Sequence, residues 1–135
     1  MTASINLSAC MQCHCLAARR SARALTRLYD KQLRPHGLRT TQFSVLVALA
    51  AAGPMRVGAL AAALGLERTT LTRSADLLER NGWVASEASD DGRERRMRLT
   101  KTGQRKLESA YPAWKTAQDS AEKRVRKSSL TAATA

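Results

Sequence analysis

The stretch that decides the fold is VGALAAALGLERTTLTRSADLLERNGWV, residues 57–84. Its first part, GALAAALGL, is rich in alanine and leucine and contains Gly65, which suits the left-handed cap that ends a helix. A second helix is predicted over residues 68–80, because its apolar residues fall on one face at steps of three and four: Leu71, Ala75 and Leu78. Two short helices joined by a tight glycine-bearing turn are typical of a helix-turn-helix.

The residues on either side of this helix pair predict a buried helix and a two-stranded wing. Upstream, Thr40 can cap an apolar helix that Gly53 and Pro54 stop, and Met55 to Val57 could form a short edge strand. Downstream, we expect a strand over residues 83–89, a turn in SDDGR and a returning strand over residues 95–99. Alternation places Met97 and Leu99 on one face of this last strand and the arginines at 96 and 98 on the other.

Long helices are predicted at both ends of the chain. From Ser8 to Arg34, apolar and basic residues separate onto opposite sides of one helix, which Pro35 and Gly37 end. A last helix starts near Thr100 and carries Pro112, which is expected to bend it. The predicted fold is therefore mainly α with a small β-wing. A winged helix-turn-helix occupies residues 38–101, and helical regions flank it at residues 1–37 and 102–135.

Composition points to a polyanionic partner. The 135 residues include 23 Lys and Arg against 11 Asp and Glu, a formal charge of +12, with a sequence pI near 10.8. Nucleic acid is the first candidate and an anionic membrane surface the second. No apolar run approaches the ~20 residues of a membrane span, and no secretory signal is recognisable. We therefore expect a cytoplasmic protein without membrane partners.

The second helix of the pair and the wing carry the residues that suit DNA. Arginine can bond a guanine edge with two donors, and threonine can bond a base or phosphate and contact a thymine methyl. The predicted base-reading residues are Arg68, Thr69, Thr70, Thr72 and Arg73. On the wing, Arg93 is expected to enter a minor groove, while Arg95 and Arg96 neutralise phosphates. The alternative is that these are ordinary solvated surface residues.

Together with the following DDGRERRMRLTKTG, residues 90–103, the stretch 57–84 resembles the MarR family of winged helix-turn-helix regulators. The resemblance implies a homodimer built from the first and last helices, which binds a pseudo-palindromic operator in double-stranded DNA. It also implies release of the operator by a small-molecule effector or an oxidant, usually from a repressor. One departure is the ending RKSSLTAATA, where relatives continue into another apolar helix, so the dimer interface is expected to be smaller or the chain truncated.

The run CMQCHC, residues 10–15, contains the chain's three cysteines, which are candidates for detecting an oxidant or a metal ion. In the organic-hydroperoxide sensors that this family includes, the resemblance places the reactive cysteine at Cys15 and a supporting tyrosine at Tyr29, whereas Thr40 stands where a second tyrosine is found. A thiol redox switch, metal or metalloid binding through soft ligands, and a reduced apolar filler all remain open for Cys10, Cys13 and Cys15. On a regular helix Cys15 faces away from the other two, so no closed tetrahedral metal site is expected.

No pattern of catalytic residues is recognisable, and neither a cofactor nor a resident metal is expected. The chain has two histidines, no nucleophile elbow and no phosphate-binding loop. Two other classes of function compete with the sequence-specific regulator. A nonspecific architectural DNA-binding protein needs little more than the charge of +12, and a protein-interaction module would use the winged helix against acidic protein surfaces.

Overall fold

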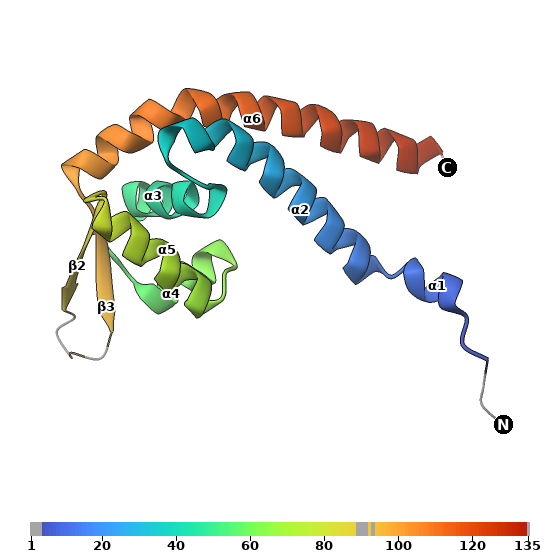
Figure 1. The fold of residues 1–135 in the computed structure, drawn as a ribbon, viewed down its shortest axis with the longest axis horizontal. Coiled ribbons are helices and arrows are strands. Elements are labelled where there is room, and N and C mark those ends of the chain that lie inside the picture. The colour runs from blue at the N-terminus through green and yellow to red at the C-terminus, as the bar shows by residue number, and fades with distance from the viewer. Residues whose placement is uncertain (1–3, 89–91, 93, 135) are drawn as a thin grey trace.

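The computed structural model describes residues 4–88, 92 and 94–134, and Figure 1 shows their fold. A helical core carries a small sheet at one end, and two long helices extend from the other. In chain order the elements are α1 Leu7–Met11, α2 His14–Leu33, a 3-10 turn η1 Arg34–His36, α3 Thr40–Ala52, β1 Met55–Arg56, α4 Val57–Leu64, α5 Arg68–Arg80, β2 Val84–Ala88, β3 Arg95–Leu99 and α6 Lys101–Thr134. The mainly α fold with a β-wing is confirmed.

The helix pair α4 and α5 packs on α3 around one apolar core. The inner face of α5 is buried through Leu71, Ala75 and Leu78, the three residues that the periodicity selected. Gly65 ends α4 with φ of 63° and ψ of 33°, the left-handed conformation that glycine adopts without strain, so the predicted cap is confirmed. Burying these side chains leaves the opposite face of α5 available to solvent.

The sheet has the strand order β1-β3-β2, with all pairs antiparallel. The central strand β3 pairs Met97 with Met55 of β1 and with Ser86 of β2. Met97 is fully buried, whereas Arg96 and Arg98 are exposed, as the alternation predicted. The short edge strand β1 therefore fastens the wing to the helical core.

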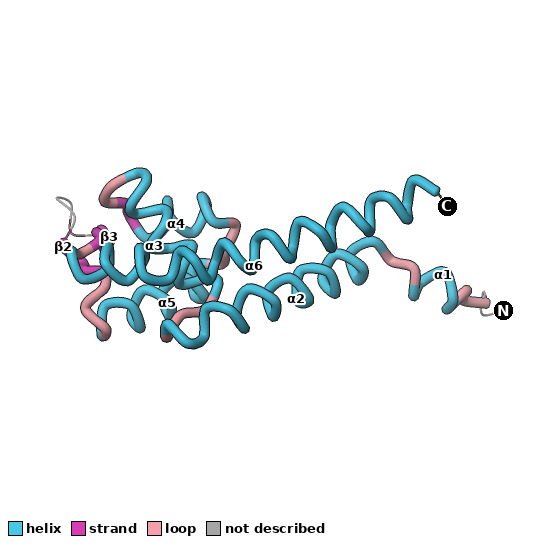
Figure 2. Tube along the Cα trace, turned by 90° about the horizontal axis from the view of Figure 1, so that it is seen from above, coloured by secondary structure: helices cyan, strands magenta, loops and turns pink. Residues whose placement is uncertain are grey.

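Helices α2 and α6 pack against each other near the core and extend from it toward the two termini (Figures 1 and 2). The Tyr29 hydroxyl on α2 donates to the side-chain oxygen of Gln118 on α6. Burial, together with the negative charge of Glu122, raises the pKa of the Tyr29 phenol, which favours the protonated form that donates this hydrogen bond. Among the described residues, no helix combines the length and apolar character that a membrane crossing requires.

The prediction of one continuous helix from Ser8 to Arg34 is wrong. The helix is broken at Gln12 and Cys13, and Cys13 has the extended backbone angles φ −60° and ψ 126° before α2 begins. None of the residues of α1 is buried. Because no residue of α1 is buried, little packing stabilises a continuous helix through this segment, and local propensity alone does not hold it together.

The start of α6 is fixed to the end of α5 by a close backbone approach. The Thr100 hydroxyl accepts from the Gly103 amide at 3.0 Å and donates to the Gly82 carbonyl oxygen at 2.6 Å. A Cβ added at Gly103 would lie 1.9 Å from the carbonyl oxygen of Trp83. Only glycine fits at this position, so the angle between α6 and the helix-turn-helix depends on it.

Replacing Gly103 with alanine is expected to lower the free energy of unfolding by about 1–3 kcal/mol or more, because the added methyl group forces α6 away from Trp83. Urea denaturation followed by circular dichroism measures the change. The exposed Ser109→Ala substitution on the same helix is the control and should leave the stability almost unchanged. Equal stability of the two variants would contradict the close approach.

Candidate nucleic-acid interface

The outer face of α5 presents short polar side chains and one arginine near its start. Thr69, Thr70 and Arg73 are exposed, as the sequence predicted for base-reading residues. Thr72 is half-buried, and its hydroxyl donates to the Arg68 carbonyl oxygen at 2.8 Å. The short threonines leave the helix backbone accessible to a groove, while the Thr72 hydroxyl is committed to the helix itself.

The predicted base-reading residue Arg68 is paired within the chain. Its guanidinium lies 2.7 Å from a carboxylate oxygen of Glu94 in the wing. The same oxygen accepts from the backbone amide of Gly58 in the first turn of α4, at 2.8 Å. A Cβ at Gly58 would lie 2.6 Å from that oxygen, so glycine makes room for the carboxylate. Glu94 thus joins the wing to the starts of both helices of the pair.

The predicted phosphate contact Arg95 is also paired within the chain. One guanidinium nitrogen lies 2.9 Å from Asp76 and another lies 2.5 Å from Glu79, both on α5. The second oxygen of Glu79 accepts from the Ser86 hydroxyl at 2.5 Å and from the Ser86 amide at 3.2 Å. The guanidinium therefore bridges β3 to α5, and Glu79 continues the connection to β2.

Of the remaining wing arginines, the structure describes Arg96 and Arg98 but not Arg93. Arg96 and Arg98 are exposed on one face of β3. Arg93, the predicted minor-groove residue, lies outside the described residues. Contacts of these arginines with DNA stay predictions, and the exposure of Arg96 is compatible with its expected role at a phosphate.

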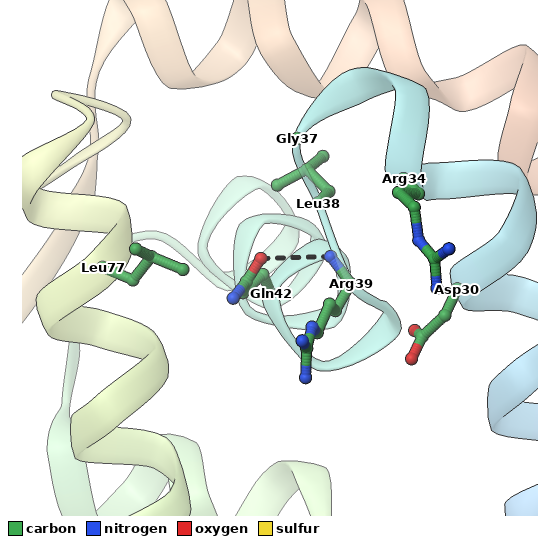
Figure 3. A pocket seen from close by; sticks show the side chains of 7 residues that line it. All are labelled: Asp30, Arg34, Gly37, Leu38, Arg39, Gln42 and Leu77. Atoms are coloured by element: carbon green, nitrogen blue, oxygen red, sulfur yellow. Dashed lines mark hydrogen bonds between the residues drawn. The ribbon is translucent and has the colours of Figure 1, made fainter.

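Two hollows lie beside α5, between this helix and the segment joining α2 to α3. One has a volume of about 500 Å³, and Figure 3 shows its lining: Asp30, Arg34, Gly37, Leu38, Arg39, Gln42 and Leu77. The other, of about 420 Å³, shares three of these residues and is lined by Arg39, Thr41, Gln42, Thr70, Arg73, Ser74, Leu77 and Arg80. The second hollow therefore contains two of the predicted base-reading residues.

The candidate sensing residues are not gathered into one site within the chain. Cys10, Cys13 and Cys15 are all exposed, so none fills the apolar core. Cys15 and Tyr29 lie fourteen positions apart on the same helix, which separates them by about 21 Å along its axis. No group of three or more His, Cys, Asp or Glu side chains positioned to hold a metal ion is found among the described residues.

The polar contacts between the wing and α5 were not predicted from the sequence. Asp76 and Glu79 are three positions apart, so they share the side of α5 that faces the wing. Opposite them in space, Arg95 of β3 carries the complementary charge and pairs with both acids. The spacing of the two acids was the available signal, but their pairing with β3 depends on how the hairpin packs.

Known proteins match this arrangement over most of the chain. Residues 38–94 match the sequence model of the MarR family. The uncharacterised HTH-type transcriptional regulator YwoH of Bacillus subtilis (strain 168) is 40% identical over 88 residues, which are 65% of this chain and 64% of that protein. The transcriptional repressor MprA of Escherichia coli (strain K12) is 34% identical over 86 residues, 62% of this chain and 49% of MprA. The alignments thus span about two thirds and one half of these relatives.

A solved structure extends the similarity to the flanking helices. The M. tuberculosis transcriptional regulator MosR, crystallised in complex with DNA, is 38% identical to this chain and has a TM-score of 0.74. The match covers 88% of this chain and 92% of MosR. The similarity therefore includes the long helices as well as the winged helix-turn-helix.

Replacing Glu94 with alanine is expected to lower the free energy of unfolding by about 1 kcal/mol, because the charged acceptor of the Gly58 amide is lost. Urea denaturation measures the effect. Glu87→Ala is the matched control, since it removes the same charge from an exposed position in β2. An equal loss in both variants would mean that the Glu94 contact contributes nothing specific.

Proposed function

Because the chain belongs to the MarR family, we propose that it is a sequence-specific regulator of transcription that binds double-stranded DNA and acts as a repressor. The observation that carries the proposal is the exposed outer face of α5, where Thr69, Thr70 and Arg73 lie beside a basic wing. The N-terminal half of such a helix enters the major groove in helix-turn-helix proteins. The DNA complex of MosR and the repressor MprA support the same function.

Base reading is assigned to Thr69, Thr70 and Arg73 at the start of α5. Arg68 would join them on leaving Glu94, and Thr72 would contribute its methyl group, because its hydroxyl is bonded within the helix. Phosphate and minor-groove contacts are assigned to Arg93 and Arg96 on the wing. The DNA-binding unit comprises residues 38–101, and residues 1–37 and 102–135 form the dimerisation region. A homodimer would place two α5 helices in successive major grooves of a pseudo-palindromic operator.

Exposed apolar side chains support the homodimer. Ile5, Leu7 and Met11 are 60–73% exposed near the N-terminus, and Val125 is 51% exposed on α6. Leu7 and Met11 belong to α1, Ile5 precedes it, and Val125 belongs to α6; both elements extend away from the helix-turn-helix (Figure 1). Exposed large apolar side chains are stabilised when a second copy of the chain covers them.

Control of DNA binding is assigned to a small ligand or to cysteine oxidation. The second hollow beside α5 favours a ligand. A molecule bound there by Arg39 and Arg73 would compete with DNA for the Arg73 side chain. The exposed Cys10, Cys13 and Cys15 favour oxidation, since exposed thiols are accessible to peroxides. The relation to the organic-hydroperoxide sensors remains a prediction, as does a response to metals or metalloids.

Arg73→Ala is expected to cost about 1–3 kcal/mol of binding free energy at the base pair it reads and to relax specificity there. Arg96→Ala is expected to weaken binding equally on all sequences and to lower the salt slope by about one unit. Selection of bound DNA from a random library identifies the operator, and fluorescence anisotropy at several salt concentrations measures both effects. Equal losses on operator and random DNA for Arg73→Ala would contradict the base-reading role.

Competition between the selected operator and random DNA tests the class of function. A preference of at least ~10³ supports a regulator, whereas a much smaller one indicates an architectural DNA-binding protein. A palindromic consensus supports the homodimer. Absence of any DNA binding at low salt would leave a protein-interaction module as the remaining class.

Replacing Cys10, Cys13 and Cys15 together with serine is expected to abolish release of the operator by cumene hydroperoxide if a thiol is the sensor, because serine cannot form a sulfenic acid or a disulfide. Anisotropy of labelled operator DNA follows the release. Zinc, copper and arsenite are added separately to test soft-ligand binding. A triple variant that responds as the parent does would exclude both thiol hypotheses and leave the hollows as the candidate site of control.

A further inference from the structure

Neighbouring residues of the wing contact opposite ends of α5 with opposite charges. Glu94 holds Arg68 in the first turn of the helix, at 2.7 Å. The next residue, Arg95, holds Asp76 and Glu79 in its second half, at 2.9 and 2.5 Å. The wing is thus attached to α5 at two separated points, and rotation of one relative to the other requires breaking at least one of them.

The group of Arg95, Asp76 and Glu79, here called the Arg95 fork, is built for one geometry. Two nitrogens of one planar guanidinium donate hydrogen bonds to two carboxylates that lie three positions apart on a helix. Glu79 is itself fixed by two bonds from Ser86 of β2. The fork therefore joins three elements, α5, β2 and β3, through side chains that are each between one third and one half exposed.

We infer that Arg95 is a positioning residue, which sets the wing against α5 and neutralises the two acids beside the DNA-reading face, and is not a phosphate contact. The inference rests on the proposed DNA-binding function. If Arg95 turned toward a phosphate, it would leave Asp76 and Glu79 unneutralised close to the DNA backbone, where like charges repel. Within the Arg95 fork, the positive charge of Arg95 lowers the repulsion between these two acids and the DNA backbone, although Arg95 itself does not contact DNA.

The first test compares three variants on the selected operator over a range of salt concentrations. Arg95→Ala is expected to weaken binding by roughly tenfold or more, because it unmasks two acids and releases the wing. Its salt slope should stay near that of the parent, whereas the matched Arg96→Ala control lowers the slope by about one unit. Arg95→Lys should bind more weakly than the parent, since an ammonium group cannot span both carboxylates. Parental binding by Arg95→Lys, together with a slope lowered by one unit in Arg95→Ala, would overturn the inference.

The second test asks whether Arg95 acts through Glu79. Glu79→Gln is made in the parent and in the Arg95→Ala background, and operator affinity is measured for all four proteins. The substitution should favour binding at least ~3-fold more in the Arg95→Ala background, where it removes an unmasked acid. The same fold-change in both backgrounds would mean that the two residues act independently. It would exclude an effect of Arg95 on operator affinity through Glu79.

A third measurement needs no DNA and separates failure of this inference from failure of the proposed function. Amide hydrogen exchange of the DNA-free protein should be faster at Ser86 in Arg95→Ala than in the parent or in Arg96→Ala, because Glu79 loses its second anchor. Unchanged exchange at Ser86 would overturn the positioning role even if DNA binding is confirmed. If the parent binds no duplex DNA at low salt, the proposed function fails, and faster exchange still supports the fork as a wing anchor.

Discussion

Presentation of the outer face of α5 depends on burial of its inner face. Leu71, Ala75 and Leu78 are fully buried against the core, so the helix has one rotational setting about its axis. That setting places Thr69 and Arg73 in solvent and turns Glu79 toward the wing. A rotation of α5 that exposed the buried leucines would cost about 1.5–3 kcal/mol for each. The apolar contacts thus decide which polar side chains are available to DNA.

Apolar burial alone does not orient the wing, because β2 and β3 extend beyond the core. Along β2, burial falls from Val84 at the base of the hairpin to the exposed Glu87 and Ala88 toward its tip. Ion pairs and hydrogen bonds to α5 hold the outer part. Each exposed pair contributes little by itself. Several of them together, attached at both ends of α5, restrict the wing more than any single pair does.

The sequence predicted the helix-turn-helix well because its elements are held by periodic apolar contacts. The limits of α5 at Arg68 and Arg80 and the cap at Gly65 follow from local pattern and backbone preference. The break at Cys13 did not follow, because the absence of tertiary contacts cannot be read from periodicity. Neither did the partners of Arg95, since a pattern assigns a residue to a face and does not say which side chain from another element lies opposite.

The junction of α2 and α3 connects the flanking helices to the face of α5 that is proposed to read DNA. Asp30 near the end of α2 accepts from both the amide and the hydroxyl of Thr40, each at 2.7 Å, at the first residue of α3. A shift of α2 therefore moves the start of α3, which lines both hollows beside α5. Gln42 lies at this junction and faces Leu77 of α5 across the first hollow, which Arg39 also lines (Figure 3). Under the proposed control by a ligand or by cysteine oxidation, a change in the packing of α2 would be transmitted to α5 through the start of α3.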